Sequence, residues 1–190
     1  DLGSALRPVP GLQVSRVDPF NYAVSSRGFN DSTASKLLVL MDGRSLYSQT
    51  YSGAYWSYHE LMLEDVDRIE IIRGPGATLW GANAVNGVIN IATKSAFSTL
   101  GSLATAARGN ELDALLAVRH GFKLGDHTAM RVYARYHDEG NFGATTGVGY
   151  RGWSNQLFGA RLDWRRPGGG GLMLTAEYRD QATSSLTTLA

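Results

Sequence analysis

The 190-residue chain contains no cysteine, so it offers no disulfide bond, no thiolate metal site and no cysteine nucleophile. Lysine and proline are also scarce, with 5 prolines and three lysines, Lys36, Lys94 and Lys123. The 18 basic and 17 acidic side chains give a net charge of +1, without a long run of either sign. A broad basic face for nucleic acid is therefore not expected.

Long hydrophobic runs are missing as well. Even the longest runs, such as Leu37–Met41, fall far short of the roughly 18 apolar residues of a membrane-spanning helix. No basic segment followed by an apolar stretch stands at the N-terminus, so no signal peptide is visible. Glycine, by contrast, is abundant at 23 residues, and 43% of the residues are hydrophobic. This composition favours strands and turns around a buried core.

Residues 1–95 are predicted to form a mixed α+β domain. Apolar runs of strand length, rich in Val, Ile and Leu, alternate there with glycine-rich turns. These predicted strands are Leu12–Val17, Ala23–Phe29, Leu37–Met41, Val66–Ile72 and Gly87–Ala92. Short helices are expected around Glu60–Glu64 and Ala77–Ala84.

Residues 96–190 show a different pattern. Apolar and polar residues alternate along four segments of about ten residues each, and a weaker fifth candidate covers about Gly101–Arg108. Because successive side chains of a strand point to opposite faces, each segment has one apolar and one charged face. This pattern fits either an antiparallel sheet on a soluble core or the strands of a transmembrane β-barrel.

Strand length and aromatic placement favour the barrel, because strands of soluble proteins average only about five or six residues. Four aromatic residues are expected on the apolar faces near strand ends, as in an interfacial girdle. They are Phe122, Tyr136, Trp164 and Tyr178. Tight turns at Gly125-Asp126 and Pro167–Gly171 contrast with a long polar connection at Glu139–Trp153, which is typical of the two rims of such barrels.

The number of predicted strands is too small for a closed barrel. Single-chain bacterial barrels need at least eight strands, and an open sheet edge in lipid leaves backbone groups unsatisfied. We therefore expect the chain to be part of a longer protein.

The segment Val66–Lys94 combines a strand, the turn Arg73–Gly76, a short helical stretch and a second strand. A strand followed by Gly-x-Gly and a helix superficially suggests a phosphate-binding loop. The match is poor, because Pro75 removes a backbone donor and no Gly-Lys-Ser/Thr follows. A soluble nucleotide-binding enzyme is therefore the weakest of the alternatives.

The same segment resembles the plug domain of TonB-dependent outer-membrane transporters. The elements of this resemblance follow one another over about residues 1–94: Pro10–Val14, Arg27-Gly28-Phe29, Leu38–Arg44, Glu64–Arg73 and Gly81–Ile91. In this family the plug is followed directly by the first strands of a large barrel, whose lumen it fills. The resemblance implies an N-terminally truncated α+β plug domain at 1–95 and the first antiparallel strands of an incomplete transmembrane β-barrel at 96–190.

The resemblance also implies a function. Such a protein sits in the outer membrane among its lipids, with the plug inside the barrel lumen and facing the periplasm. It binds a scarce, bulky ligand such as an iron–siderophore complex or a cofactor, and imports it. A TonB-type energy-coupling protein would act through a segment upstream of Asp1. The alternative is a non-transporting outer-membrane binding or signalling receptor that carries a plug-like domain.

The resemblance places two apical ligand loops at about Arg16–Ala23 and Arg44–Tyr58. Five of the chain's 19 aromatic residues fall in the second loop, and aromatic side chains suit a bulky amphipathic ligand. The expected ligand contacts are Phe20, Asn21, Tyr22, Tyr47, Tyr51, Tyr55 and Trp56.

Arg27 and Arg73 stand beside turn glycines. In the family such arginines pair with carboxylates of the barrel wall, and a guanidinium can form this kind of bidentate, breakable latch. Turn positions are expected at Gly74, Pro75, Gly76, Gly81 and Gly87.

No catalytic or metal-binding pattern emerges. The histidines His59, His120, His127 and His137 lack metal-ligand spacing, and no Gly-x-Ser-x-Gly motif occurs. We expect no enzymatic activity, no metal site, no cofactor and no nucleic-acid partner.

Overall fold

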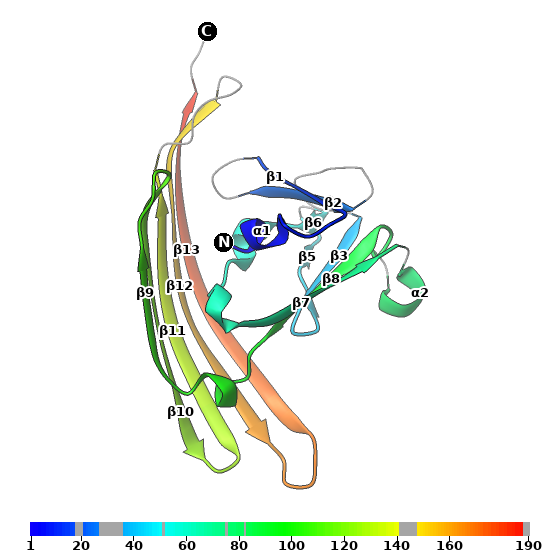
Figure 1. The fold of residues 1–190 in the computed structure, drawn as a ribbon, viewed down its shortest axis with the longest axis vertical. Coiled ribbons are helices and arrows are strands. Elements are labelled where there is room, and N and C mark those ends of the chain that lie inside the picture. The colour runs from blue at the N-terminus through cyan, green and yellow to red at the C-terminus, as the bar shows by residue number, and fades with distance from the viewer. Residues whose placement is uncertain are drawn as a thin grey trace. The chain divides into compact units, whose positions relative to one another are not determined.

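The computed structural model describes residues 1–17, 21–26, 36–50, 52–74, 76–81, 83–140 and 148–187. The chain divides into two compact units, unit 1 (Asp1–Thr93) and unit 2 (Lys94–Ala190). Figure 1 shows the helices and strands of both units, labelled where there is room.

Unit 1 combines short strands with short helical segments. In chain order these are α1 (Leu2–Leu6), β1 (Leu12–Arg16), β2 (Tyr22–Ser26), β3 (Leu37–Met41), β4 (Arg44–Ser45), β5 (Tyr47–Ser48), β6 (Gly53–Ala54), η1 (Trp56–His59), η2 (Leu63–Asp65), β7 (Val66–Arg73), α2 (Ala77–Trp80) and β8 (Gly87–Thr93). The strands β1 and β2 form an antiparallel hairpin, and β5 pairs with β6.

The centre of unit 1 is a four-stranded sheet with the order β4-β3-β8-β7. Its two middle strands, β3 and β8, run parallel, and β7 is antiparallel to β8. Val39 and Ile89 contribute to the main apolar cluster, whereas Leu38 and Val88 belong to a second, smaller cluster. The middle strands therefore bury side chains on both faces of the sheet, which explains their continuous apolar sequences.

The sequence predicted the five longer strands of unit 1, missed the two-residue strands β4, β5 and β6, and located the helices less well. β3 has the predicted bounds, and β7 and β8 each extend one residue beyond theirs. The predicted helix at Glu60–Glu64 is wrong, because η1 ends at His59 and η2 begins only at Leu63. Glu60, Leu61 and Met62 are all buried, and one face of a helix cannot bury three consecutive residues.

The second predicted helix, Ala77–Ala84, is shorter than expected. α2 ends at Trp80, and the next residue, Gly81, has a φ of 91°. A left-handed glycine directly after the last helical residue is a common helix terminator. The predicted helix therefore forms only its first turn.

Unit 2 consists of the 3-10 helix η3 (Ala96–Thr99) and five strands. The strands are β9 (Gly101–Ala107), β10 (Leu112–Gly125), β11 (Thr128–Glu139), β12 (Val148–Arg165) and β13 (Gly171–Thr187). They form one antiparallel sheet in which every strand pairs with its neighbours in sequence. Among the described residues the sheet is open, with β9 and β13 at its edges.

The predicted alternation of the strands of unit 2 is confirmed by the strand register. Val118, Ala134, Phe158 and Tyr178 are aligned across β10 to β13. One residue further along the strands, Arg119, Tyr133, Gly159 and Glu177 are aligned on the opposite face. The sheet thus has an apolar face and a polar face.

Two details of the second-half prediction are wrong. Residues 148–153, expected within a long loop, belong to β12 and pair with β13. Tyr178, expected near a strand end, lies in the middle of β13 beside Phe158. Both differences arise because β12 and β13 pair far beyond their alternating segments, and pairing partners are not visible in a local pattern.

Candidate functional site

The two segments predicted as ligand loops meet within unit 1. Asn21 precedes β2, and its side-chain amide Nδ2 donates a hydrogen bond of 2.8 Å to the Tyr55 hydroxyl, before η1. The Asn21 side chain is 5% exposed, whereas Tyr55 is half-buried. The Tyr55 ring also contacts Tyr58, with 5.1 Å between ring centroids, and Tyr58 is 44% exposed. A partly open aromatic surface is therefore held in place by a buried amide.

Two of the predicted ligand contacts are core residues. Tyr22 is 2% exposed and Trp56 is 1% exposed, and both belong to the main apolar cluster of unit 1. The Tyr22 ring packs directly against Gly3 of α1, where any β-carbon would collide with it. In this conformation neither ring has a surface open to a ligand.

The remaining predicted ligand contacts differ in their exposure. Tyr47 is half-buried in β5, which pairs with β6. Phe20 and Tyr51 lie outside the described residues. Among the predicted ligand contacts that lie in the described residues, Tyr47 and Tyr55 are therefore the ones with partly exposed side chains.

Of the two predicted latch arginines, only Arg73 lies in the described part of the chain. It is exposed at the end of β7. Its guanidinium lies against the backbone of Gly11, where a β-carbon would come within 3.3 Å of the Arg73 Cζ atom. Arg27 falls outside the described residues.

The predicted turn glycines serve different purposes. Gly74 and Gly81 have φ angles of 102° and 91°, which a side chain would strain. At Gly87 a β-carbon would come within 2.6 Å of the Ile72 carbonyl oxygen, so the close pairing of β7 and β8 requires glycine there. Gly76 needs neither a positive φ nor such a close approach, and Pro75 lies outside the described residues.

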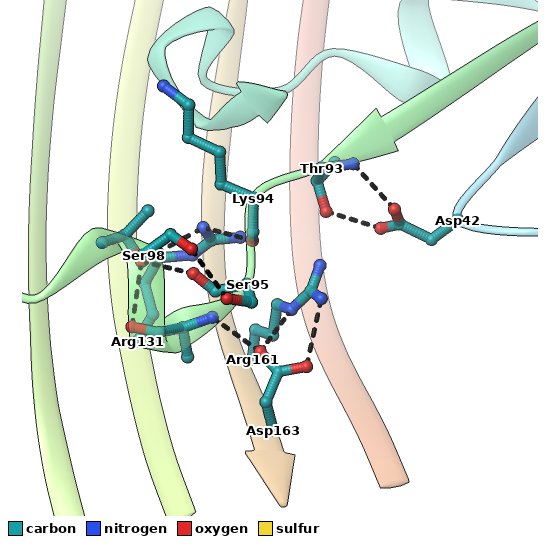
Figure 2. Close-up of polar contacts among 10 residues, drawn as sticks. Asp42, Thr93, Lys94, Ser95, Ser98, Arg131, Arg161 and Asp163 are labelled. Atoms are coloured by element: carbon teal, nitrogen blue, oxygen red, sulfur yellow. Dashed lines mark hydrogen bonds and ion pairs between the residues drawn. The ribbon is translucent and has the colours of Figure 1, made fainter. Parts of the chain in front are cut away.

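Asp42 has a structural role that sequence reasoning missed. Asp42 and Gly43, with φ angles of 49° and 80°, form the turn between β3 and β4. The two Asp42 carboxylate oxygens accept hydrogen bonds from the Thr93 backbone N–H (2.8 Å) and the Thr93 hydroxyl (2.6 Å), as Figure 2 shows. The Asp-Gly pair signals the turn, but nothing in the sequence connects it with a threonine 51 residues later.

The electrostatics of β7 are those of an exposed strand. Arg68 donates hydrogen bonds to Glu70 (2.8 Å) and Asp67 (2.9 Å), and the Asn90 amide donates to Glu70 (2.8 Å). The hydrogen bond from Arg68, followed by that from Asn90, lowers the pKa of the Glu70 carboxyl. These contacts fix charges at a sheet edge and form no reactive group.

In the described ranges, no three His, Asp or Glu side chains come together as a metal site. No helix among those residues is long and apolar enough to cross a membrane.

Comparison with known proteins identifies the family. Residues 1–88 match the family model of the TonB-dependent receptor plug domain. The vitamin B12 transporter BtuB of Vibrio vulnificus is 33% identical over 108 residues, which make up 56% of this chain and 17% of that protein. The chain belongs to the TonB-dependent receptors. This family consists of receptors and transporters, not of enzymes.

Solved structures of TonB-dependent receptors share the fold. The ferric enterobactin receptor PfeA of Pseudomonas aeruginosa matches with a TM-score of 0.69 and 21% identity, over 96% of this chain and 30% of the receptor. The pyoverdine outer membrane receptor FpvA of Pseudomonas aeruginosa PAO1 matches with a TM-score of 0.64 and 21% identity, over 95% of this chain and 25% of FpvA.

The chain is short beside its relatives. It spans 17% to 25% of the length of the curated BtuB proteins of Vibrio vulnificus and Vibrio cholerae that it matches. The comparisons therefore show the family of this chain and not the activity of the whole protein.

Proposed function

We propose that the chain is part of a TonB-dependent outer-membrane transporter that imports a scarce, bulky metal chelate. Unit 1 would be its plug domain and unit 2 the first strands of its β-barrel. The match of residues 1–88 to the plug family supports the first assignment. The boundary predicted between residues 95 and 96 lies two residues after the division between the two units, which falls after Thr93.

The apolar face of unit 2 supports the assignment to a membrane barrel. Val118, Phe158 and Tyr178 are aligned across the sheet and are 54%, 51% and 65% exposed. A soluble sheet would cover such a row with a second layer, because burial of each large apolar side chain contributes about 1.5–3 kcal/mol. In a barrel wall this row faces the lipid of the outer membrane.

The single observation that carries the ligand proposal is the hydrogen bond between Asn21 and Tyr55. It joins the two segments that the family resemblance predicts as ligand loops, and it leaves the Tyr55 ring partly open beside Tyr58. Large aromatic surfaces with polar tips suit an amphipathic chelate such as a ferric siderophore or a corrinoid. We assign Asn21, Tyr47 and Tyr55 to this surface, with Tyr22 and Trp56 as its core support.

We further propose that Arg73 pairs with a carboxylate of the barrel wall. Its guanidinium is held against Gly11 and is exposed, so a carboxylate could accept two hydrogen bonds from it. Arg27 would act in the same way. A TonB-type protein would supply the energy through a segment that is not part of this chain.

Uptake by the intact receptor tests this function. It would be produced in a bacterial host that lacks its own receptors for cyanocobalamin and ferric enterobactin, and the entry of each labelled compound would be measured. We expect energy-dependent uptake of one of these two chelates. Binding without uptake would contradict transport and favour the non-transporting receptor.

Variants of Tyr55 test the ligand surface. Tyr55→Ala should weaken binding of the transported chelate about tenfold, as expected for a contributing aromatic contact. The matched control is Tyr136→Ala, which removes a tyrosine from the apolar face of unit 2 and should leave the affinity unchanged. Equal affinity of the wild type and Tyr55→Ala would remove this loop from the binding site.

A further inference from the structure

The first residues of unit 2 are fastened to its own strands. The Lys94 carbonyl oxygen accepts a hydrogen bond of 3.1 Å from Arg131 of β11. The Ala96 N–H donates a hydrogen bond of 2.6 Å to the Asp163 carboxylate of β12. Figure 2 shows both bonds meeting the short segment that precedes β9. Residues 94–99, which we call the anchor segment, therefore cannot be an open linker.

The residues of β11 and β12 that bind the anchor segment are themselves held in place. Arg161 donates to both oxygens of Asp163, from Nε at 2.8 Å and from Nη2 at 3.0 Å. Arg131 and Asp163 are 3% and 9% exposed. Charge-assisted hydrogen bonds of this kind are shorter and roughly twice as strong as neutral ones. The anchor segment is thus bound to a preformed arrangement of charges.

Close packing adds to these bonds. The Thr99 carbonyl lies so near Gly121 of β10 that any β-carbon at this glycine would collide with it. The Arg165 guanidinium lies over the Phe97 ring, 3.9 Å from its centroid, which is a favourable cation–π distance. Three successive strands of unit 2 thus contribute a contact to the anchor segment.

Thr93, the residue before the anchor segment, is held by contacts within unit 1. Thr93 ends β8, and its N–H and hydroxyl both bind the Asp42 carboxylate. Asp42 is in turn held by its own N–H, which donates to the Ile91 carbonyl oxygen at 2.9 Å. Consecutive residues, Thr93 and Lys94, are therefore each bound within a different unit.

We propose that the anchor segment is the immobile end of the connection, so that any rearrangement of unit 1 stops at the Thr93–Lys94 peptide and does not reach the strands of unit 2. Arg131, Asp163 and, behind them, Arg161 act as positioning residues for this connection. Asp42 has the corresponding task in unit 1. The proposal concerns the chain itself and does not depend on which compound the intact protein transports.

Amide hydrogen exchange on the intact receptor tests the proposal, with overlapping peptides that separate the Thr93 amide from the Ala96 amide. Asp163→Asn removes the charge and leaves one oxygen to serve both the Ala96 N–H and Arg161, so exchange at Ala96 should speed by about 10- to 100-fold while exchange at Thr93 stays unchanged. Asp42→Gly, which keeps the turn, should do the reverse. Ser98→Ala is the control: Ser98 is exposed and its hydroxyl contacts the Ser95 hydroxyl, so neither amide should change.

The proposal would be overturned if the exchange rates of the Thr93 and Ala96 amides changed together. If Asp42→Gly speeds exchange at Ala96 as much as at Thr93, the connection is one cooperative element and no boundary lies at Thr93. If Asp163→Asn does not assemble, Thr99→Val replaces it. This variant removes the hydroxyl that contacts Arg131 at 3.4 Å and the Ser95 and Ala96 carbonyls. It should speed exchange at Ala96 alone, and unchanged exchange there would contradict the proposal.

A crosslink tests the same proposal during transport and rests on the proposed function. The Ser95 and Ser98 hydroxyl oxygens are 2.9 Å apart, and this chain has no cysteine of its own. The double variant Ser95→Cys/Ser98→Cys should take up the transported chelate equally well when oxidised and when reduced, because an immobile segment tolerates a lock. Uptake that stops on oxidation and returns on reduction would overturn the proposal. Wild-type protein without any uptake would instead contradict the proposed function and leave the exchange result standing.

Discussion

The two units place their apolar side chains in opposite ways. In unit 1, Val39 and Ile89 are 1% and 0% exposed within a core between short strands. In unit 2, Val118 and Phe158 are more than half exposed on one face of a long-stranded sheet. Valine occurs in strands of both units, buried at Val39 and exposed at Val118, so residue type alone does not decide where such a side chain lies. The difference shows that unit 1 covers its apolar side chains itself, whereas the described part of unit 2 leaves a row of them uncovered.

The largest effect is expected from truncating a core aromatic residue of unit 1. Trp56→Ala should lower the free energy of unfolding by about 3–5 kcal/mol, because the indole is buried among apolar side chains and its removal leaves a cavity. Urea unfolding of the intact receptor, followed by protease sensitivity of unit 1, measures this change. Tyr58→Ala, which truncates an exposed ring two residues later, should change it by less than about 1 kcal/mol. Equal effects of the two variants would show that Trp56 is not a core residue.

A smaller loss of stability is expected when a side chain is introduced at Gly121, against the Thr99 carbonyl. Gly121→Ala places a β-carbon against the Thr99 carbonyl and should destabilise unit 2 by about 1–3 kcal/mol. Gly125→Ala, in the same strand, has no neighbour within 4 Å of its new β-carbon and serves as the control. Heat-induced loss of compact electrophoretic mobility can compare the variants. If both behave alike, the anchor segment does not lie on β10.

The polar face of unit 2 offers a third comparison. The Tyr133 ring of β11 covers Gly159 of β12, and its hydroxyl donates to Glu177 of β13 at 2.7 Å. Tyr133→Phe should lower the free energy of unfolding by about 1.5–3 kcal/mol, the range for a hydrogen bond to a charged acceptor, and the unfolding midpoint in urea reports it. On the apolar face, Tyr178→Phe should have a smaller effect, since Tyr178 is 65% exposed. A larger effect at Tyr178 would reverse the assignment of the two faces.

The smallest effect is a pH dependence in unit 1. The pKa of Glu70 is lower in the folded state than in the unfolded chain, chiefly through the hydrogen bond from Arg68. Its stabilising contribution is therefore complete above the unfolded-state pKa and disappears as the pH falls through the folded-state value. Comparing wild type and Glu70→Gln from about pH 6 to about pH 3 should show stabilities that converge at the acidic end. Parallel curves would contradict a stabilising role for this carboxylate.

The features of the fold that depend on neighbouring residues could be predicted from the sequence. The apolar run Leu37–Met41 gave β3 its observed bounds, and the alternation around Arg131 identified both faces of β11. The end of α2 was missed although Gly81 marks it, because glycines occur throughout the chain and only a left-handed one ends a helix. The extent of β12 depends on its pairing with β13, which a single segment does not reveal.

The candidate site was only partly accessible from the sequence. Aromatic clustering identified the segment that contains Tyr55 and Trp56, but both residue types occur equally in cores and in binding surfaces. Only the fold shows that Trp56 is buried while Tyr55 stays partly open. The bonds of Asp42 to Thr93 and of Asp163 to Ala96 join residues 51 and 67 positions apart. Such distant pairs have no signal in a single sequence.

Asp42 carries two requirements at once, and this limits which residues can replace it. Its left-handed backbone favours glycine, asparagine or aspartate, and its two hydrogen bonds to Thr93 need a short side chain with two polar atoms, one of which accepts from the Thr93 N–H. Glycine satisfies only the first requirement, and glutamate carries its oxygens on a longer stem. Aspartate meets both requirements, and asparagine meets them only when the Thr93 hydroxyl turns to accept a hydrogen bond, so very few residues suit this position.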